Sequence, residues 1–324
     1  MSKKTSPKIP SPDDKLAPEQ FDSLNRQFYE GFHQELISGR LGFLCLLHEQ
    51  PELIEKLLED GASWGLLQLK VEPEEKSIET MKRNAELELV ALRQHAAEAL
   101  FRVFWVHAQK EPCPWLAIAR MRYPSDLKSV VKDYLDGHLW STQEERVIYH
   151  ARGVWGSAAI NRSGNIQDQL QLSAPVVTDW IAVAADLILD APLYNAYKHG
   201  LAIVSSKPFS MSYGGTGPKE PRQMMEASTG FSYIRRKLND ANQRYRWSLV
   251  TEPVDYQAVA VETAIFGELL GTILDTGAQD RGVKERQHAL KIHNAKLTPE
   301  KVRNPEAKSG IHIQLYEEEL LYYK

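Results

Sequence analysis

The stretch that decides the fold is residues 74–109, EEKSIETMKRNAELELVALRQHAAEALFRVFWVHAQ. It contains no Gly or Pro and is rich in Glu, Lys, Arg, Ala and Leu, the residues with the strongest helix propensity. Its apolar residues form two adjacent stripes at helical spacing, one through Leu87, Val90, Ala97, Phe101 and Phe104, the other through Leu89, Leu92, Ala96, Leu100 and Val103. A helix that is apolar over so wide an arc is expected in the middle of a bundle.

Shorter helices are expected around this segment. Prolines at positions 18, 51, 114 and 124 each precede apolar residues at helical spacing, and proline is favoured in the first turn of a helix. Residues 175–189 and 190–198 predict two more helices. Residues 153–173 are rich in Gly, Ser, Asn and Gln and are therefore expected to be a loop.

The pattern changes after Gly200. Residues 201–205 and 209–213 are β-branched or alternating and predict short strands, with further strand candidates at 246–250 and 311–315. Residues 256–276 return to helical spacing.

The sequence therefore predicts a mainly α protein: a helical bundle around a long central helix, with a small β-containing C-terminal segment. We expect a disordered tail at residues 1–16, the bundle at 17–200 and a mixed segment at 201–324.

Composition and charge limit the classes of function. The 324 residues are 43% hydrophobic and carry a formal net charge of −4, which gives no overall attraction to nucleic acid or anionic membranes. The charge is uneven, with −5 in residues 1–150 and +1 in residues 151–324, so a polyanion site is expected in the C-terminal half. Two cysteines without ligand spacing, no uncharged apolar run of about 18 residues and no signal-like N-terminus predict a cytoplasmic protein without a membrane span.

The first candidate site is YNAYKHG at residues 194–200. Asn195 and His199 are four residues apart and share a helix face. A histidine beside a lysine, here Lys198, can act as a general acid–base next to a phosphate. Alternatively, the stretch is an ordinary helix end, because Gly200 suits the left-handed position after a helix and the two cations suit its last turn.

The second candidate is the pair Arg102 and His107 in the central helix. Five residues along a helix correspond to about 140° of rotation, so the two side chains are expected to point apart. Arg102 also follows Glu98 by four residues, the ordinary spacing of an ion pair.

Both candidates resemble motifs of the HEPN superfamily of all-α bundles, which carry Arg-x(4–6)-His, and some of which end a helix in an Asn-x-x-Lys-His-like sequence. The resemblance covers residues 80–200. It implies a homodimer in which Arg and His from two protomers cleave RNA without a metal, the histidine assisting attack by the 2′-hydroxyl and the arginine steadying the phosphate. Active members often have a polar residue directly after the arginine, whereas Val103 stands there in this chain.

The third candidate is a basic stretch at residues 231–247, with one acid and interleaved aromatic residues. Basic side chains bind phosphates and aromatic rings stack on bases, so this composition suits a site for single-stranded nucleic acid. The alternative is a solvated face that balances the acidic N-terminal half. The basic residues are Arg235, Arg236, Lys237, Arg244 and Arg246.

The leading hypothesis is a HEPN-like protein that binds RNA or another polyanion, or cleaves RNA without a metal. We expect no metal site and no cofactor. The alternative is a non-catalytic helical scaffold, and a small-molecule site lined by Trp105, Trp115 and Trp180 also stays open. The sequence does not decide whether the protein is an enzyme.

Overall fold

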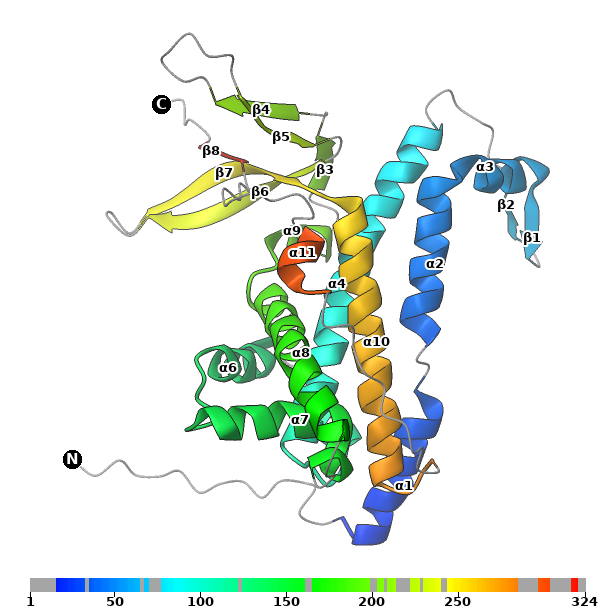
Figure 1. Ribbon diagram of the computed structural model, residues 1–324. Helices are drawn as coiled ribbons and strands as arrows, with labels where there is room; N and C mark the ends of the chain where they lie inside the picture. Colours follow the sequence, from blue (N-terminus) through cyan, green and yellow to red (C-terminus); the bar gives the residue numbers. More distant parts are fainter. Residues whose placement is uncertain are drawn as a thin grey trace.

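Figure 1 shows the computed structural model of the chain. The structure describes residues 16–32, 35–64, 67–69, 77–121, 124–160, 165–198, 203–206, 209–213, 222–227, 230–239, 244–284, 297–303 and 316–319.

The predicted fold class is confirmed: the protein is mainly α, with a long central helix. That helix, α4 (Ser77–Ala108), packs along α10 (Tyr256–Asp280), α8 (Asn165–Leu189) and α7 (Gln143–Ile160). The remaining helices are α1 (Pro18–Gly31), α2 (Glu35–Glu49), α3 (Pro51–Asp60), α5 (Pro114–Arg120), α6 (Pro124–Leu135), α9 (Pro192–Lys198) and α11 (Pro299–Arg303).

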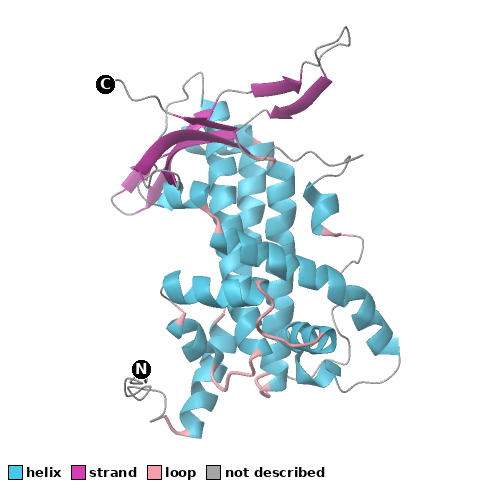
Figure 2. Ribbon diagram, turned by 90° about the vertical axis from the view of Figure 1, so that its left-hand side faces the viewer, coloured by secondary structure: helices cyan, strands magenta, loops and turns pink. Residues whose placement is uncertain are grey.

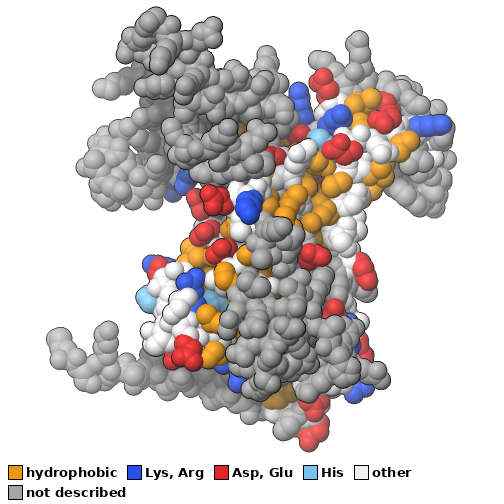
Figure 3. Space-filling view, viewed as in Figure 1, with side chains coloured by type: hydrophobic (Ala, Val, Ile, Leu, Met, Phe, Trp, Pro, Cys, Tyr) orange, Lys and Arg blue, Asp and Glu red, His pale blue; other side chains and the backbone are white. Residues whose placement is uncertain are grey.

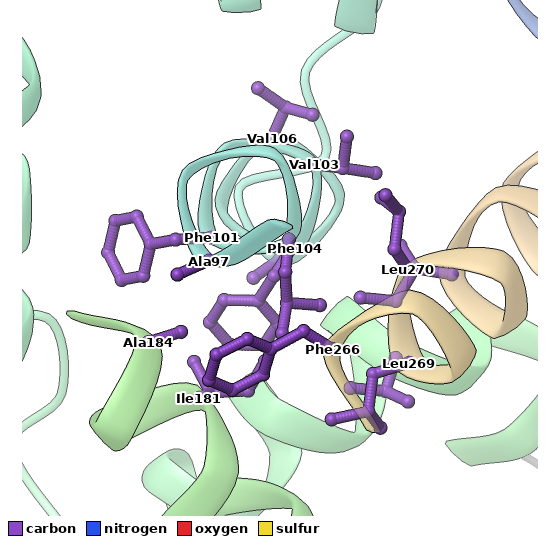
Figure 4. Close-up of a cluster of buried hydrophobic side chains, with 14 of the residues drawn as sticks. Ala97, Phe101, Val103, Phe104, Val106, Ile181, Ala184, Phe266, Leu269 and Leu270 are labelled. Atoms are coloured by element: carbon purple, nitrogen blue, oxygen red, sulfur yellow. The ribbon is translucent and has the colours of Figure 1, made fainter. Parts of the chain in front are cut away.

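The main core lies where α4, α8 and α10 meet (Figure 4). Phe101 and Phe104 of α4, Ile181 of α8 and Phe266 of α10 are completely buried there. Each such side chain contributes about 1.5–3 kcal/mol by leaving water. Helices from both halves of the chain therefore cover the apolar stripes of the central helix.

The helix α10 comes from the predicted mixed segment but lies inside the bundle. It contributes Phe266, Leu269 and Leu270 to the main core, so helices before and after residue 200 share one core. Among the described residues, α10 is the one helix long and apolar enough to cross a membrane by length and composition, and half of its most apolar window is buried in the protein. Its apolar surface is used in packing against α4.

The predicted loop at residues 153–173 is wrong, because most of it is helical. Residues 143–160 belong to α7, which is interrupted at Gly156 (φ 71°), and α8 begins at Asn165. Gly153 lies against the Phe104 ring so closely that a Cβ would collide with it. This glycine allows α7 to approach α4, and in the sequence it resembles a loop signal.

The C-terminal strands form a four-stranded antiparallel sheet at one end of the helices (Figure 2). Its order is β3 (Ile203–Ser206), β6 (Gly230–Asn239), β7 (Arg244–Pro253) and β8 (Tyr316–Glu319). Two separate hairpins are β1 (Ala62–Trp64) with β2 (Leu67–Leu69), and β4 (Phe209–Tyr213) with β5 (Arg222–Ala227).

Three of the four predicted strands match β3, β4 and β7, and the fourth, at 311–315, lies outside the described residues. The sequence did not predict β5 and β6, which carry charged residues that are uncommon in strands.

One face of the large sheet packs on the bundle through a second apolar cluster. Phe231, Tyr233 and Val250 of the sheet meet Leu89 of α4 and Leu193 of α9. The short helix α9 therefore lies between the sheet and the central helix.

Candidate functional site

Two tyrosines attach α9 to the middle of α4. The Tyr194 hydroxyl lies 2.8 Å from Nε2 of His95, and the Tyr197 hydroxyl donates a hydrogen bond of 2.5 Å to Glu88. Asn195 and Lys198 lie on the exposed side of α9. The structure therefore brings the charge of one predicted site residue, Lys198, within electrostatic range of His95, an imidazole that the sequence did not single out.

The electrostatics of this contact favour neutral groups. Burial lowers the pKa of His95, and the positive charges of Arg40 and Lys198 lower it further. The hydrogen bond to Glu88 raises the pKa of Tyr197 to about 12. At neutral pH His95 is an uncharged imidazole with cations nearby, a state that can accept a proton.

His199 lies outside the described residues. Its proposed role, with those of Asn195 and Lys198, stays a prediction from the sequence.

Arg102 and His107 have different neighbours. Arg102 forms the expected ion pair with Glu98 (3.4 Å), and both side chains are partly exposed. His107 is buried, and its Nε2 lies 2.5 Å from the Tyr29 hydroxyl of α1. The two residues therefore do not form one constellation within the chain.

The surroundings of His107 are those of a core residue. Gly277 of α10 lies so close that a Cβ there would collide with the imidazole. Burial, with a smaller contribution from Arg281, lowers the pKa of His107 to about 3. His107 is also 12 residues from His95, about 18 Å along the helix axis, so it is remote from the α9 contact.

The predicted basic residues lie on one hairpin. The β6–β7 register places Arg235 opposite Ser248, Arg236 opposite Trp247 and Lys237 opposite Arg246. Arg244 follows at the end of the ladder, opposite Asn239. All five basic residues therefore fall in the half of the hairpin that lies away from α10, which we call the distal half (Figure 1).

The distal half contains an unfavourable cross-strand pair. Lys237 and Arg246 occupy directly opposite positions of the antiparallel ladder. Like charges at such positions are unfavourable in a sheet. The backbone register therefore gathers positive charge in the distal half.

A buried ion-pair network joins the bundle to the C-terminal segment. The carboxylate of Glu262, on α10, accepts from Arg93 of α4 at 3.0 Å and from Arg303 of α11 at 2.5 Å. Its side chain is 2% exposed. Half-buried Glu252 of β7 lies within the field of Arg93, and burial raises the pKa of its carboxyl.

This network was not predicted from the sequence, although one of its residues stands out there. Glu262 is an acid inside the apolar run of α10, and a buried charge of that kind is almost always paired. Its partners, Arg93 and Arg303, are 169 and 41 residues away in the chain, so no local pattern identifies them.

Within the described part of the chain, no three His, Cys, Asp or Glu side chains gather in a way that could hold a metal ion. The polar groups at the α4–α9 contact, among them His95 and Lys198, offer acid–base chemistry and a cationic contact.

No family model matches this chain. Neither curated proteins nor solved structures provide a match. The HEPN resemblance therefore rests on the residues quoted from the sequence, and function has to be argued from the geometry of the chain itself.

Proposed function

We propose that this protein binds RNA or another polyanion through the distal half of the β6–β7 hairpin. The observation that carries the proposal is the register that gathers Arg235, Arg236, Lys237, Arg244 and Arg246 there. Neutralising phosphate charge and releasing counterions supplies most of the affinity in such complexes.

The test is fluorescence anisotropy with a labelled 15-nucleotide oligo(U) over a series of salt concentrations. The double variant Lys237→Ala/Arg246→Ala removes two phosphate contacts. It should therefore reduce the magnitude of the slope of log K against log salt by about 1.4, since each contact to a single strand contributes about 0.7. The control, Arg26→Ala/Lys132→Ala, removes two exposed cations of the helical bundle and should leave the slope unchanged. Equal losses in both double variants would reject the hairpin as the site.

The RNA cleavage implied by the HEPN resemblance can be tested in the same preparations. RNA is incubated with wild type, His199→Ala and Arg102→Ala in EDTA, so that only metal-independent cleavage is scored. Because Arg102 is engaged by Glu98, we expect Arg102→Ala to keep any activity that His199→Ala removes. Cleavage abolished by both variants would instead support the paired Arg–His mechanism.

A second candidate function is a non-catalytic scaffold. Figure 3 shows hydrophobic side chains gathered over the upper parts of α2 and α10. On α2, Leu36, Phe43 and Leu46 are 62%, 54% and 39% exposed. Exposed apolar patches are typical of protein interfaces. The test is sedimentation velocity: a scaffold that self-associates through α2 should be a dimer that Leu36→Ser/Phe43→Ser makes monomeric.

A further inference from the structure

Four of the five basic residues of the hairpin share one face of the sheet. Side chains alternate along a strand, and directly opposite residues lie on the same face. By the β6–β7 register these four fall on the face of Tyr233 and Val250, which pack on the bundle, and we call it the inner face. The four residues are Arg235, Lys237, Arg244 and Arg246.

The edge strand β8 brings acidic residues to the same face. Glu317 lies opposite Val250, and Glu319 lies opposite Ser248. Val250 and Ser248 are buried on the inner face, where they are 1% and 5% exposed. Glu317 and Glu319 therefore also occupy inner-face positions. Ser248 separates Glu319 from Arg235 in one row across the three strands.

The strand that supplies these acids is short and lies at the edge of the sheet. Three of the four residues of β8 are glutamate, a residue depleted in strands. Among the described strands, β8 pairs with β7 alone, and its register runs from Thr251 to Ser248, towards the distal half. Few backbone hydrogen bonds therefore hold an acidic strand beside the face to which a phosphate backbone would bind.

We propose that β8 is an autoinhibitory strand: its glutamate positions border the basic inner face, and a polyanion gains access to this face by displacing β8 from β7. This inference rests on the proposed polyanion binding at the hairpin and specifies how that site is regulated. The alternative is a fixed strand, because charges on an edge strand also protect a sheet from pairing with other chains. A fixed β8 would weaken binding by its charge alone.

The experiment locks β8 onto β7 with a reversible disulfide in the variant Leu249→Cys/Glu318→Cys. The two positions are directly opposite each other on the outer face, so their Cα atoms are about 4.5–5.5 Å apart, within the range of a disulfide. The control, Val204→Cys/Ser232→Cys, joins a directly opposite pair of β3 and β6 at the other edge of the sheet. Each variant is compared with itself, oxidised and reduced, so its other residues and their charges stay the same. Peptide mapping verifies each disulfide.

Oxidised Leu249→Cys/Glu318→Cys should bind labelled 15-nucleotide oligo(U) about tenfold more weakly than the reduced form. The reason is that apparent affinity falls with the fraction of molecules in the binding-competent state, here the state with β8 displaced. The control should bind equally in both forms. In the wild type, hydrogen–deuterium exchange at the amides of residues 316–319 should become faster when oligo(U) is added.

Equal affinity of the oxidised and reduced forms of Leu249→Cys/Glu318→Cys would overturn the inference. It would make β8 a fixed acidic edge and leave the hairpin as the binding site. Unchanged or slower exchange at residues 316–319 in the presence of bound oligo(U) would also overturn it. A wild type that binds no oligo(U) would reject the proposed function itself.

Discussion

The C-terminal end of α4 and the distal half of the β6–β7 hairpin both contain candidate site residues predicted from the sequence. The two regions differ in the neighbours of those residues. At the end of α4, Arg102 is engaged by Glu98 and His107 by Tyr29. On the hairpin, Lys237 and Arg246 oppose each other in the ladder, and Arg236 is exposed. Internal partners point to a structural role for the first region, and the gathering of five basic residues in one half of a hairpin points to a ligand for the second.

The largest effect is expected where the two halves of the chain are joined. Glu262→Ala leaves Arg93 and Arg303 without their shared carboxylate, and breaking a buried ion pair from one side costs about 3–5 kcal/mol of unfolding free energy. Urea denaturation measures the loss. The control, Glu79→Ala, breaks an exposed pair with Arg83 and should cost about 0.5 kcal/mol or less. Similar losses in both variants would contradict a structural role for the network.

The pH dependence of the unfolding free energy tests whether His107 is a buried core residue. Its folded pKa of about 3 lies below the ordinary value of 6.5, so the unfolded chain binds the proton first. The stabilisation is therefore complete above pH 6.5 and is lost as the pH falls from 6.5 towards 3, by about 1.4 kcal/mol per pH unit.

The measurement is urea denaturation at several pH values between 6.5 and 4. His107→Gln should flatten the pH dependence by that amount. His138→Gln, which removes an exposed histidine, should leave it as in the wild type. A wild-type slope retained in His107→Gln would show that the imidazole is accessible to protons in the folded state, as a catalytic histidine requires.

The acidic strand β8 pairs with β7 of the hairpin and offers a further test of polyanion binding there. Its register places Glu319 opposite Ser248, one diagonal step from Arg246, with Glu317 and Glu318 beside it. Changing all three glutamates to glutamine should strengthen oligo(U) binding about fivefold, because about 1 kcal/mol of repulsion is removed. An equal gain in the charge-matched control Glu19→Gln/Glu52→Gln/Glu144→Gln would mean that only net charge matters.

The smallest effect is expected for Arg102→Ala. An i,i+4 pair of partly exposed side chains contributes about 0.3–0.5 kcal/mol, so the thermal midpoint should change little. Oligo(U) affinity should not change at all. A tenfold loss of affinity would place the nucleic acid at α4 and invert the comparison.

The helices could be predicted from the sequence because their signals are local. The absence of Gly and Pro from residues 77–108 and their apolar spacing suffice to predict α4, and prolines correctly mark the starts of α1, α3, α5 and α6. Gly153 suggested a loop in the sequence, but its structural role is to allow the close approach of the Phe104 ring. This role depends on a residue 49 positions away and leaves no local signal. The helix predicted to begin at Pro175 begins ten residues earlier, at Asn165, and contains Pro175 in its interior.

The candidate site was predictable in composition and less so in geometry. The basic residues of the hairpin were identified by charge, yet their opposition across two strands depends on the pairing of β6 with β7. The partners His95 and Tyr194 are 99 residues apart, and the three residues of the Glu262 network come from three helices. Contacts of this kind follow from packing and leave no spacing pattern in the sequence.

Ultraviolet cross-linking of oligo(U) to the full-length protein, followed by peptide mapping, tests the central claim most directly. Because the polyanion is proposed to bind the distal half of the β6–β7 hairpin, cross-links should map to residues 230–253 and be lost in Lys237→Ala/Arg246→Ala. Cross-links confined to residues 77–108 or 192–198 would contradict this account and return the site to the helical bundle.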